Sequence, residues 1–167
     1  FAANVWDTLD KVRERVADLV LVHGGDGKGV DRLAAAWAER RKVPVAVVSN
    51  SPFRVPTGPL VERVVVSGGF DAADDWIAER AGPRTVVITA DILLADRCLK
   101  AGATVIGNNG WPFTHGSIGG AIATRAIMAD LRAGGDVVGG PPPFSKADRS
   151  RFLQALDEAL VRIERMG

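Results

Sequence analysis

Short apolar runs rich in valine alternate along this chain with longer segments of helical periodicity. The apolar runs cover residues 19–22, 43–48, 63–66, 85–89 and 103–106. Continuous apolar runs of this length are typical of strands that are buried on both faces of a parallel sheet. The alternation predicts an α/β fold of three layers, Rossmann-like, with a parallel sheet of about five strands and helices on both faces.

The segments between the apolar runs supply the crossovers that parallel strands need. Helices are expected over residues 6–16, 30–41, 72–81, 93–101, 118–132 and about 146–163. Ser145 is the expected N-cap of the last of these helices. Loops are expected where proline and glycine gather, at residues 51–59, 111–120 and 134–143.

Composition excludes several classes of protein. The 167 residues suit one domain, and 21 basic against 20 acidic residues argue against a protein that coats a polyanion. Cys98 is the single cysteine, which excludes a disulfide scaffold and a cysteine-based zinc cluster. No apolar run approaches the roughly 20 residues that span a bilayer, and no segment has the pattern of a signal peptide. We therefore expect a cytoplasmic protein with no membrane partner.

Ligands of parallel sheets bind outside the carboxyl ends of the strands, so the residues that follow each strand are the candidates for function. The first strand ends in a turn with four glycines, Gly24, Gly25, Gly27 and Gly29, and one lysine, Lys28. Exposed N–H groups at the start of the next helix attract anions, which predicts a site for a phosphate or a nucleotide. The spacing matches neither the Walker A nor the dinucleotide motif. The alternative is a tight turn without a ligand.

Arg54 follows the second strand in a loop bounded by prolines, where a guanidinium could clamp a phosphate oxygen. A plain surface arginine is an equal alternative. The basic residues of the last helix alternate with acidic ones and predict a solvated face; they are Arg149, Arg151, Arg162 and Arg165. The four tryptophans could mark the core or an interface, and the pattern does not separate the two.

Aspartates follow the third and fourth strands. Asp71, Asp74 and Asp75 come after the third strand, and Asp91 ends the fourth. Carboxylates that meet at one place repel each other unless a cation lies between them, and Mg²⁺ or Mn²⁺ prefers such oxygen ligands. This predicts metal-assisted phosphoryl chemistry, with Asp71 and Asp91 as the catalytic carboxylates. The alternative is that these residues cap helices or face solvent.

Five stretches of the chain, over about residues 42–167, resemble the YaiI/YqxD family of bacterial proteins. They are residues 43–45, 50–56, 69–77, 88–92 and 139–149. The family is similar to PIN-like nucleases, which implies an acidic metal site at the strand ends and RNA as a substrate class. The resemblance therefore implies a ribonuclease-type phosphodiesterase that uses Mg²⁺ or Mn²⁺.

The first part of the chain departs from that family. Its members begin with a strand that carries an Asp-x-Asp-x-Cys-Pro signature, and this chain has the glycine turn instead, with only Asp26 near that place. Residues 6–44 resemble the YspA-like branch of the SLOG superfamily, which implies nucleotide binding through the glycine loop. The expected organisation is one α/β domain over residues 1–167, a chimera of a SLOG-like portion (1–44) and a YaiI/YqxD-like portion (45–167).

Three hypotheses about function follow from these residues. In the first, Asp26, Asp71, Asp74, Asp75 and Asp91 surround a metal ion that serves phosphodiester hydrolysis, with the first acidic pair of the family missing. In the second, the glycine turn binds a nucleotide or a phosphate without catalysis. In the third, the chain is a stable chimeric fold with no activity.

Overall fold

The computed structural model of the protein describes residues 18–24, 29–51, 58–67, 69, 71–135 and 144–166. Three predicted segments lie wholly or partly outside the described residues. They are the first helix (6–16), the loop after the second strand and the glycine- and proline-rich connection before the last helix.

The described residues form one sheet of six strands in the order β3-β2-β1-β4-β5-β6. The strands are β1 (Leu19–His23), β2 (Val45–Ser49), β3 (Val61–Val65), β4 (Thr85–Ile88), β5 (Thr104–Ile106) and β6 (Pro112–Phe113). All pairs are parallel except β5 with β6, which is antiparallel. The prediction of a parallel α/β sheet is confirmed, with one strand more than expected.

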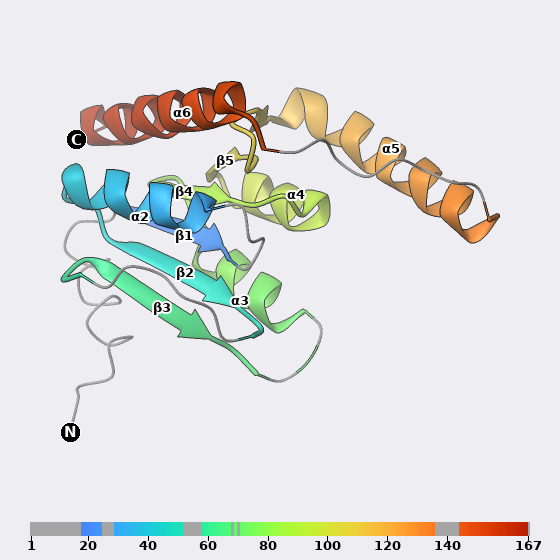
Figure 1. Ribbon diagram of the computed structural model, residues 1–167, viewed down its shortest axis with the longest axis horizontal. Helices are drawn as coiled ribbons and strands as arrows, with labels where there is room; N and C mark the ends of the chain where they lie inside the picture. The colour runs from blue at the N-terminus through green and yellow to red at the C-terminus, as the bar shows by residue number, and fades with distance from the viewer. Residues whose placement is uncertain are drawn as a thin grey trace.

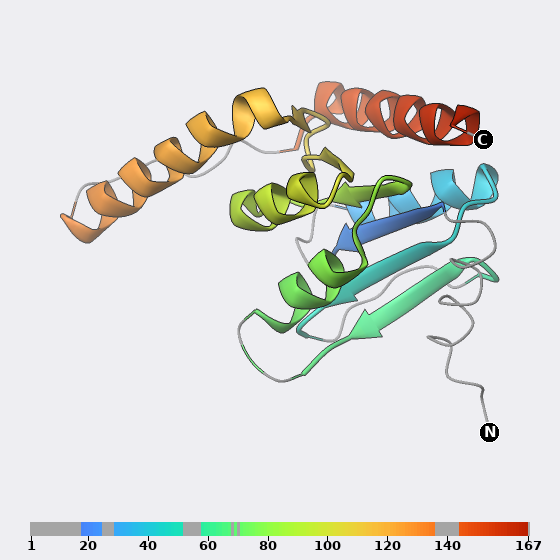
Figure 2. The ribbon, with the colours of Figure 1, turned by 180° about the vertical axis from the view of Figure 1, so that it is seen from behind.

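Helices cover both faces of this sheet (Figures 1 and 2). They are α2 (Val30–Arg40), α3 (Ala72–Arg80), α4 (Ile92–Lys100), α5 (His115–Ala133) and α6 (Lys146–Arg165). One buried cluster joins α2 and α6 to one face of the sheet. The other cluster joins α3, α4 and the start of α5 to the opposite face.

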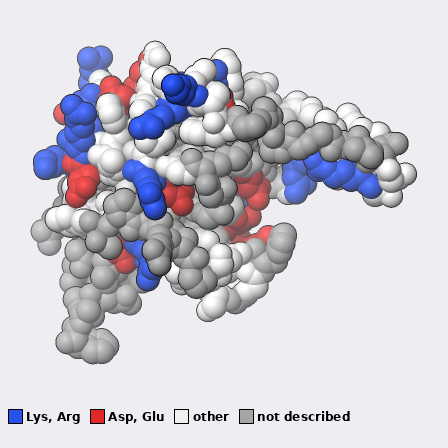
Figure 3. Space-filling model, viewed as in Figure 1, with Lys and Arg blue, Asp and Glu red and all other residues white. Residues whose placement is uncertain are grey.

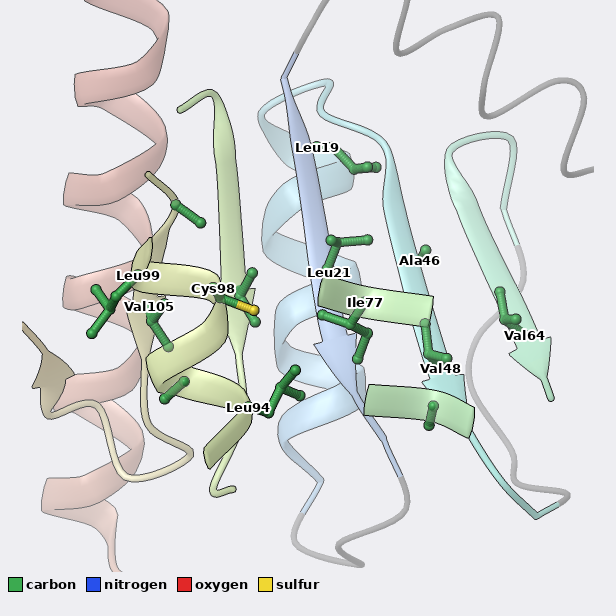
Figure 4. Close-up of a cluster of buried hydrophobic side chains, with 14 of the residues drawn as sticks. Leu19, Leu21, Ala46, Val48, Val64, Ile77, Leu94, Cys98, Leu99 and Val105 are labelled. Carbon is green, nitrogen blue, oxygen red and sulfur yellow. The ribbon is translucent and has the colours of Figure 1, made fainter. Parts of the chain in front are cut away.

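The alternation of side chains along each strand explains the two clusters. In β1, Val20 and Val22 belong to the cluster under α2 and α6, while Leu19 and Leu21 belong to the cluster under α3 and α4 (Figure 4). Successive side chains of a strand point to opposite faces, so a strand between two helical layers must be apolar at every position. This is why the apolar runs of the sequence located the central strands.

Two elements differ from the prediction for residues 111–120, which were expected to form a loop. β6 lies in this segment, and Pro112 fits there because β6 is an edge strand, where a missing N–H group costs no ladder bond. α5 begins at His115, three residues before the expected start. Thr114 and Ser117 form a reciprocal capping box, and this local signal starts a helix despite the nearby glycines.

α5 projects away from the body of the molecule in both ribbon views (Figures 1 and 2). Ile118 near its start is buried against the sheet, whereas Ile127, Met128 and Leu131 in its second half are exposed. In the described part of the chain, no helix combines the length and the apolar composition that crossing a membrane requires.

The strand order reverses its direction of growth between β1 and β4. From β1 the chain adds β2 and β3 on one side, then passes through α3 to β4 on the other side. The carboxyl ends of β1 and β4 therefore lie side by side, with Val22 paired to Ile88. In open α/β sheets, such a switch point leaves a crevice in which ligands bind.

The loop between β5 and β6 approaches α6 closely at Gly110. A Cβ atom at this position would lie 2.4 Å from the backbone nitrogen of Phe152, and the φ angle of Gly110 is +90°. Gly119 in α5 has no atom within 4 Å of such a Cβ. A methyl group would overlap α6 at Gly110 and would meet open space at Gly119. Alanine variants at these two positions therefore form a matched test and control.

We expect Gly110→Ala to lower the free energy of unfolding by about 2 kcal/mol or more, because it adds a steric overlap to backbone strain. Gly119→Ala should raise it by up to about 1 kcal/mol, because alanine favours the helix. Urea denaturation midpoints measure both effects. Equal midpoints for the two variants would contradict the close approach of this loop to α6.

Candidate functional site

His23 is the last residue of β1 and lies at the switch point of the sheet. Its Nδ1 atom lies 3.0 Å from the hydroxyl oxygen of Thr89, which follows β4 and is fully buried. Its Nε2 atom lies 3.4 Å from Oδ1 of Asp74 in α3. Because Nε2 faces a carboxylate, we assign the proton of the neutral ring to Nε2, which leaves Nδ1 to accept the hydroxyl proton of Thr89.

Asp74 reaches this point through the packing of α3. The helix follows β3 but packs on β1 and β2, so its first turn lies over the carboxyl end of the sheet. The side chain of Asp74 is only 18% exposed, and that of His23 is 25% exposed. The two groups are therefore partly shielded from water, which strengthens their electrostatic interaction.

The pKa of Asp74 is raised above its ordinary value. Burial is the largest cause, and the negative charges of Asp91 and Asp71 raise the pKa further. His23 and Arg97 act in the opposite direction and lower it. Asp71 lies before α3 and Asp91 lies before α4, and the charges of both therefore act on Asp74.

Asp91 has a structural role as well as a place near Asp74. It is the N-cap of α4, where its Oδ1 atom accepts the backbone N–H of Leu94 at 3.0 Å. Its own N–H donates to the hydroxyl of Thr89 at 2.9 Å. Asp91 therefore caps a helix, as the alternative interpretation of the sequence predicted, and its charge also acts on Asp74.

Asp71 differs from Asp91 in this respect. It stands at the N-cap position of α3, yet its side chain forms no capping hydrogen bond. Asn50, which follows β2, accepts the backbone N–H of Ala73 at 3.0 Å in its place. The exposed carboxylate of Asp71 is thereby left without a helix-capping role.

Asp75 points to a different partner from Asp74. Its side chain is 56% exposed and forms an ion pair of 2.8 Å with Arg97 of α4. A guanidinium beside a carboxylate neutralises it and satisfies its oxygens. The charges of Asp71 and Asp91 therefore act on the pKa of Asp74, while Asp75 is occupied by Arg97.

The glycine turn is described only at its two ends. Gly24 donates its N–H to the carbonyl of Val48 at 2.8 Å, and a Cβ on it would lie 2.8 Å from a methyl group of Val47. Gly29 is the N-cap of α2, with a φ angle of 78°. The other candidates lie outside the described residues, namely Gly25, Asp26, Gly27, Lys28 and Arg54.

Asp71 and Asp91 both raise the pKa of Asp74 for a reason that the sequence did not indicate. We expected Asp71 and Asp91 on neighbouring strands, but β2 and β1 lie between β3 and β4. α3 packs on β1 and β2, and this packing brings Asp74 to His23 at the end of β1. The sequence reasoning also missed His23 and Thr89 as site residues, although both end strands that meet at the switch point.

The described residues limit what kind of metal site this edge of the sheet could hold. Among the residues that the structure describes, no three side chains of His, Cys, Asp or Glu are grouped so that they could hold a metal ion. Mg²⁺ commonly binds through one or two carboxylates, several waters and the phosphates of a substrate. A metal site at Asp74 would therefore have to be of this open mode rather than an all-protein cage.

Cys98 is fully buried on the inner face of α4. Burial raises the pKa of the Cys98 thiol to about 12, with a smaller lowering by Arg97. The thiol therefore stays protonated at neutral pH, and a cysteine nucleophile is not part of this site.

Comparisons with known proteins match most of the chain. A family model described as "Uncharacterized BCR, YaiI/YqxD family" matches residues 24–162. A UPF0178 protein of Sphingopyxis alaskensis is 72% identical over 131 residues, which are 78% of this chain and 84% of that protein. A UPF0178 protein of Nitrobacter winogradskyi is 59% identical over 128 residues, which are 77% of this chain and 82% of that protein. No solved structure matches the chain.

The family match begins at Gly24, so it includes part of the segment that resembles the SLOG superfamily. The central position of β1 and its pairing with both β2 and β4 show that this first portion shares one sheet with the rest. The nucleotide-binding role implied by the SLOG resemblance stays a prediction.

The raised pKa of Asp74 predicts how stability depends on pH. A carboxyl whose folded pKa lies above its unfolded value of about 3.9 stabilises the fold below that pH. This stabilisation is lost as the pH rises through the folded pKa. Asp74→Asn keeps the side chain neutral, so the variant should be more stable than the wild type at pH 7.

Urea midpoints measured from about pH 4 to pH 7 test this prediction, since the advantage of Asp74→Asn should grow across that range. Asp75→Asn, which removes an exposed ion pair, is the control and should show no such gain. An Asp74→Asn variant that is less stable than the wild type at pH 7 would contradict the assigned electrostatics.

Proposed function

This chain belongs to the YaiI/YqxD family. We propose that it is a phosphodiesterase that acts on RNA with Mg²⁺ or Mn²⁺ at the switch point of the sheet. The observation that carries the proposal is Asp74. A partly buried carboxylate with two further carboxylates nearby is costly for a fold, and a bound cation would offset that cost.

The residues that would hold the metal ion are Asp74 and its two acidic neighbours, Asp71 and Asp91. When bound, a divalent cation would polarise the phosphate and lower the pKa of a coordinated water. Asp71 is exposed, so it can meet the substrate as well as the ion. Asp91 is fixed in place by its hydrogen bonds to Leu94 and Thr89, so its position costs little side-chain entropy on binding.

His23 supplies the proton chemistry in this proposal. The buried hydroxyl of Thr89 orients its ring, and Nε2 holds a proton beside Asp74. Histidine exchanges protons near neutral pH, and one placed at a phosphoryl site can give a proton to a leaving oxygen. We assign His23 Nε2 to that role and Thr89 to the positioning of the ring.

The second candidate function is binding of a nucleotide or phosphate without turnover. A cavity of about 480 Å³ lies where α2 and α6 begin, and Gly29, Arg32, Lys146 and Arg149 line it. None of these three basic side chains forms an ion pair with another residue in the described ranges. Basic groups beside the glycine turn support the prediction of anion binding there.

Cleavage of a short RNA that carries a fluorophore and a quencher tests the first proposal. The wild type should cleave it with Mg²⁺ or Mn²⁺ and lose activity in EDTA. Asp74→Asn should lower the rate at least about tenfold, as loss of a group at a metal site does. Asp75→Asn is the matched control, one residue away with the same charge change, and should stay within about twofold.

Two results would count against the phosphodiesterase. The first is equal rates for the wild type and Asp74→Asn. The second is no cleavage by the wild type with either metal, which would favour binding without turnover or an inactive fold.

A further inference from the structure

A second cavity lies on the opposite face of the sheet from Asp74, between α6 and the edge formed by β5 and β6. Its volume is about 380 Å³, within the range of sites for small molecules. Ile106, Ala155 and Ala159 supply apolar surface inside it, and charged or polar side chains stand around them. An apolar interior with a few polar groups is the usual composition of a ligand site.

Trp111 stands at one end of this cavity and is 60% exposed. An indole exposed to that extent leaves a large aromatic surface in water. Its backbone is held in place, because the N–H of Trp111 donates to Asn109 Oδ1 at 3.1 Å and its carbonyl accepts the N–H of Gly107 at 2.9 Å. The loop therefore presents the ring without needing to reorganise, which lowers the entropic cost of binding.

The sequence predicted that Arg151 would face solvent together with the other basic residues of this helix. In the structure, Arg151 instead packs beside Trp111. Its guanidinium carbon lies 4.3 Å from the centre of the indole ring. Its Nη1 atom donates to the carbonyl of Asn109 at 3.1 Å and to Asp148 at 3.0 Å. Arg151 thus covers one face of the Trp111 ring and places positive charge on it, which leaves the other face of the ring for a ligand.

The remaining polar groups of the cavity come from one stripe of α6. Gln154 donates to Glu158 at 3.2 Å, and Arg162 lies farther along the same stripe, where it donates to Thr104 at 3.4 Å. Eleven residues separate Arg151 from Arg162, which corresponds to about 16 Å along a helix. The cavity therefore has an aromatic end, a hydrogen-bonding middle and a cationic end.

From this arrangement we infer that the cavity binds a nucleotide, either free or as one unit of a single strand of RNA. A base stacks on the face of Trp111 that Arg151 does not cover, as bases stack on aromatic side chains in proteins that bind single strands. Gln154 and Glu158 offer both a donor and acceptors to the edge of the base, which a simple anion would not use. Arg162 faces the phosphate. The site is separate from Asp74 and does not depend on the proposed phosphodiesterase.

Calorimetric titration with AMP, adenosine and a short oligoadenylate tests this inference. All titrations are done in EDTA, so the outcome is independent of any metal site. Trp111→Ala should weaken binding of AMP or of the oligoadenylate about tenfold or more, and Trp111→Phe should retain most of the affinity. Thermal melts establish that both variants are folded, as expected for an exposed side chain.

Arg162→Gln tests the phosphate end of the site. It should weaken binding of AMP severalfold and leave binding of adenosine unchanged. Arg132→Gln in α5 is the control, because it makes the same change of charge away from the cavity. Binding of AMP indicates a free nucleotide as the ligand, whereas binding of the oligoadenylate alone indicates a strand; both outcomes support the site.

The inference is overturned if neither AMP nor the oligoadenylate binds the wild type. It is also overturned if Trp111→Ala binds them as tightly as the wild type does. It is also overturned if Trp111→Ala changes the oligomeric state in sedimentation while nucleotides have no effect. That result would make Trp111 part of an interface between copies of the chain.

Discussion

The pairing of β1 with β4 is the constraint on which the rest of the structure depends. Because the chain adds β2 and β3 on one side of β1 before it forms β4 on the other, α3 must cross over β2 and β1. That crossing carries Asp74 to the end of β1, where His23 and Thr89 already meet across the strand pair. The candidate site is thus a product of topology, since its residues come from three separate segments of the chain, at the end of β1, the start of α3 and the connection between β4 and α4.

Charge is unevenly distributed around this edge of the sheet. Acidic surface is visible between α3 and α4, and basic surface lies over α2 and α6 (Figure 3). Two carboxylates of the site region have a stabilising partner: Asp75 pairs with Arg97, and Asp91 accepts the N–H of Leu94. Asp74 differs, because burial and its acidic neighbours outweigh the effect of His23 and Arg97. Such a group lowers stability at neutral pH, which is the cost that the proposed cation would offset.

The sequence predicted the layers of the fold better than it predicted the site. Valine-rich runs identify buried strands because both faces of each strand are covered, as at Val20 and Leu21. Strand order is not encoded in these runs, so the separation of β3 from β4 could not be foreseen, and neither could the contact of His23 with Asp74. Trp111 was visible in the sequence, but its exposure beside Arg151 follows from the loop that Gly110 brings against α6.

The central claim is that Asp74 and its neighbours form an open site for a divalent cation at the switch point of the sheet. Crystals soaked in Mn²⁺ test it most directly, because anomalous scattering locates the ion without reference to activity. We predict an anomalous peak within coordination distance of the Asp74 carboxylate, on the side that faces Asp91 and Asp71. Full occupancy at other positions with no peak beside Asp74 would contradict the claim.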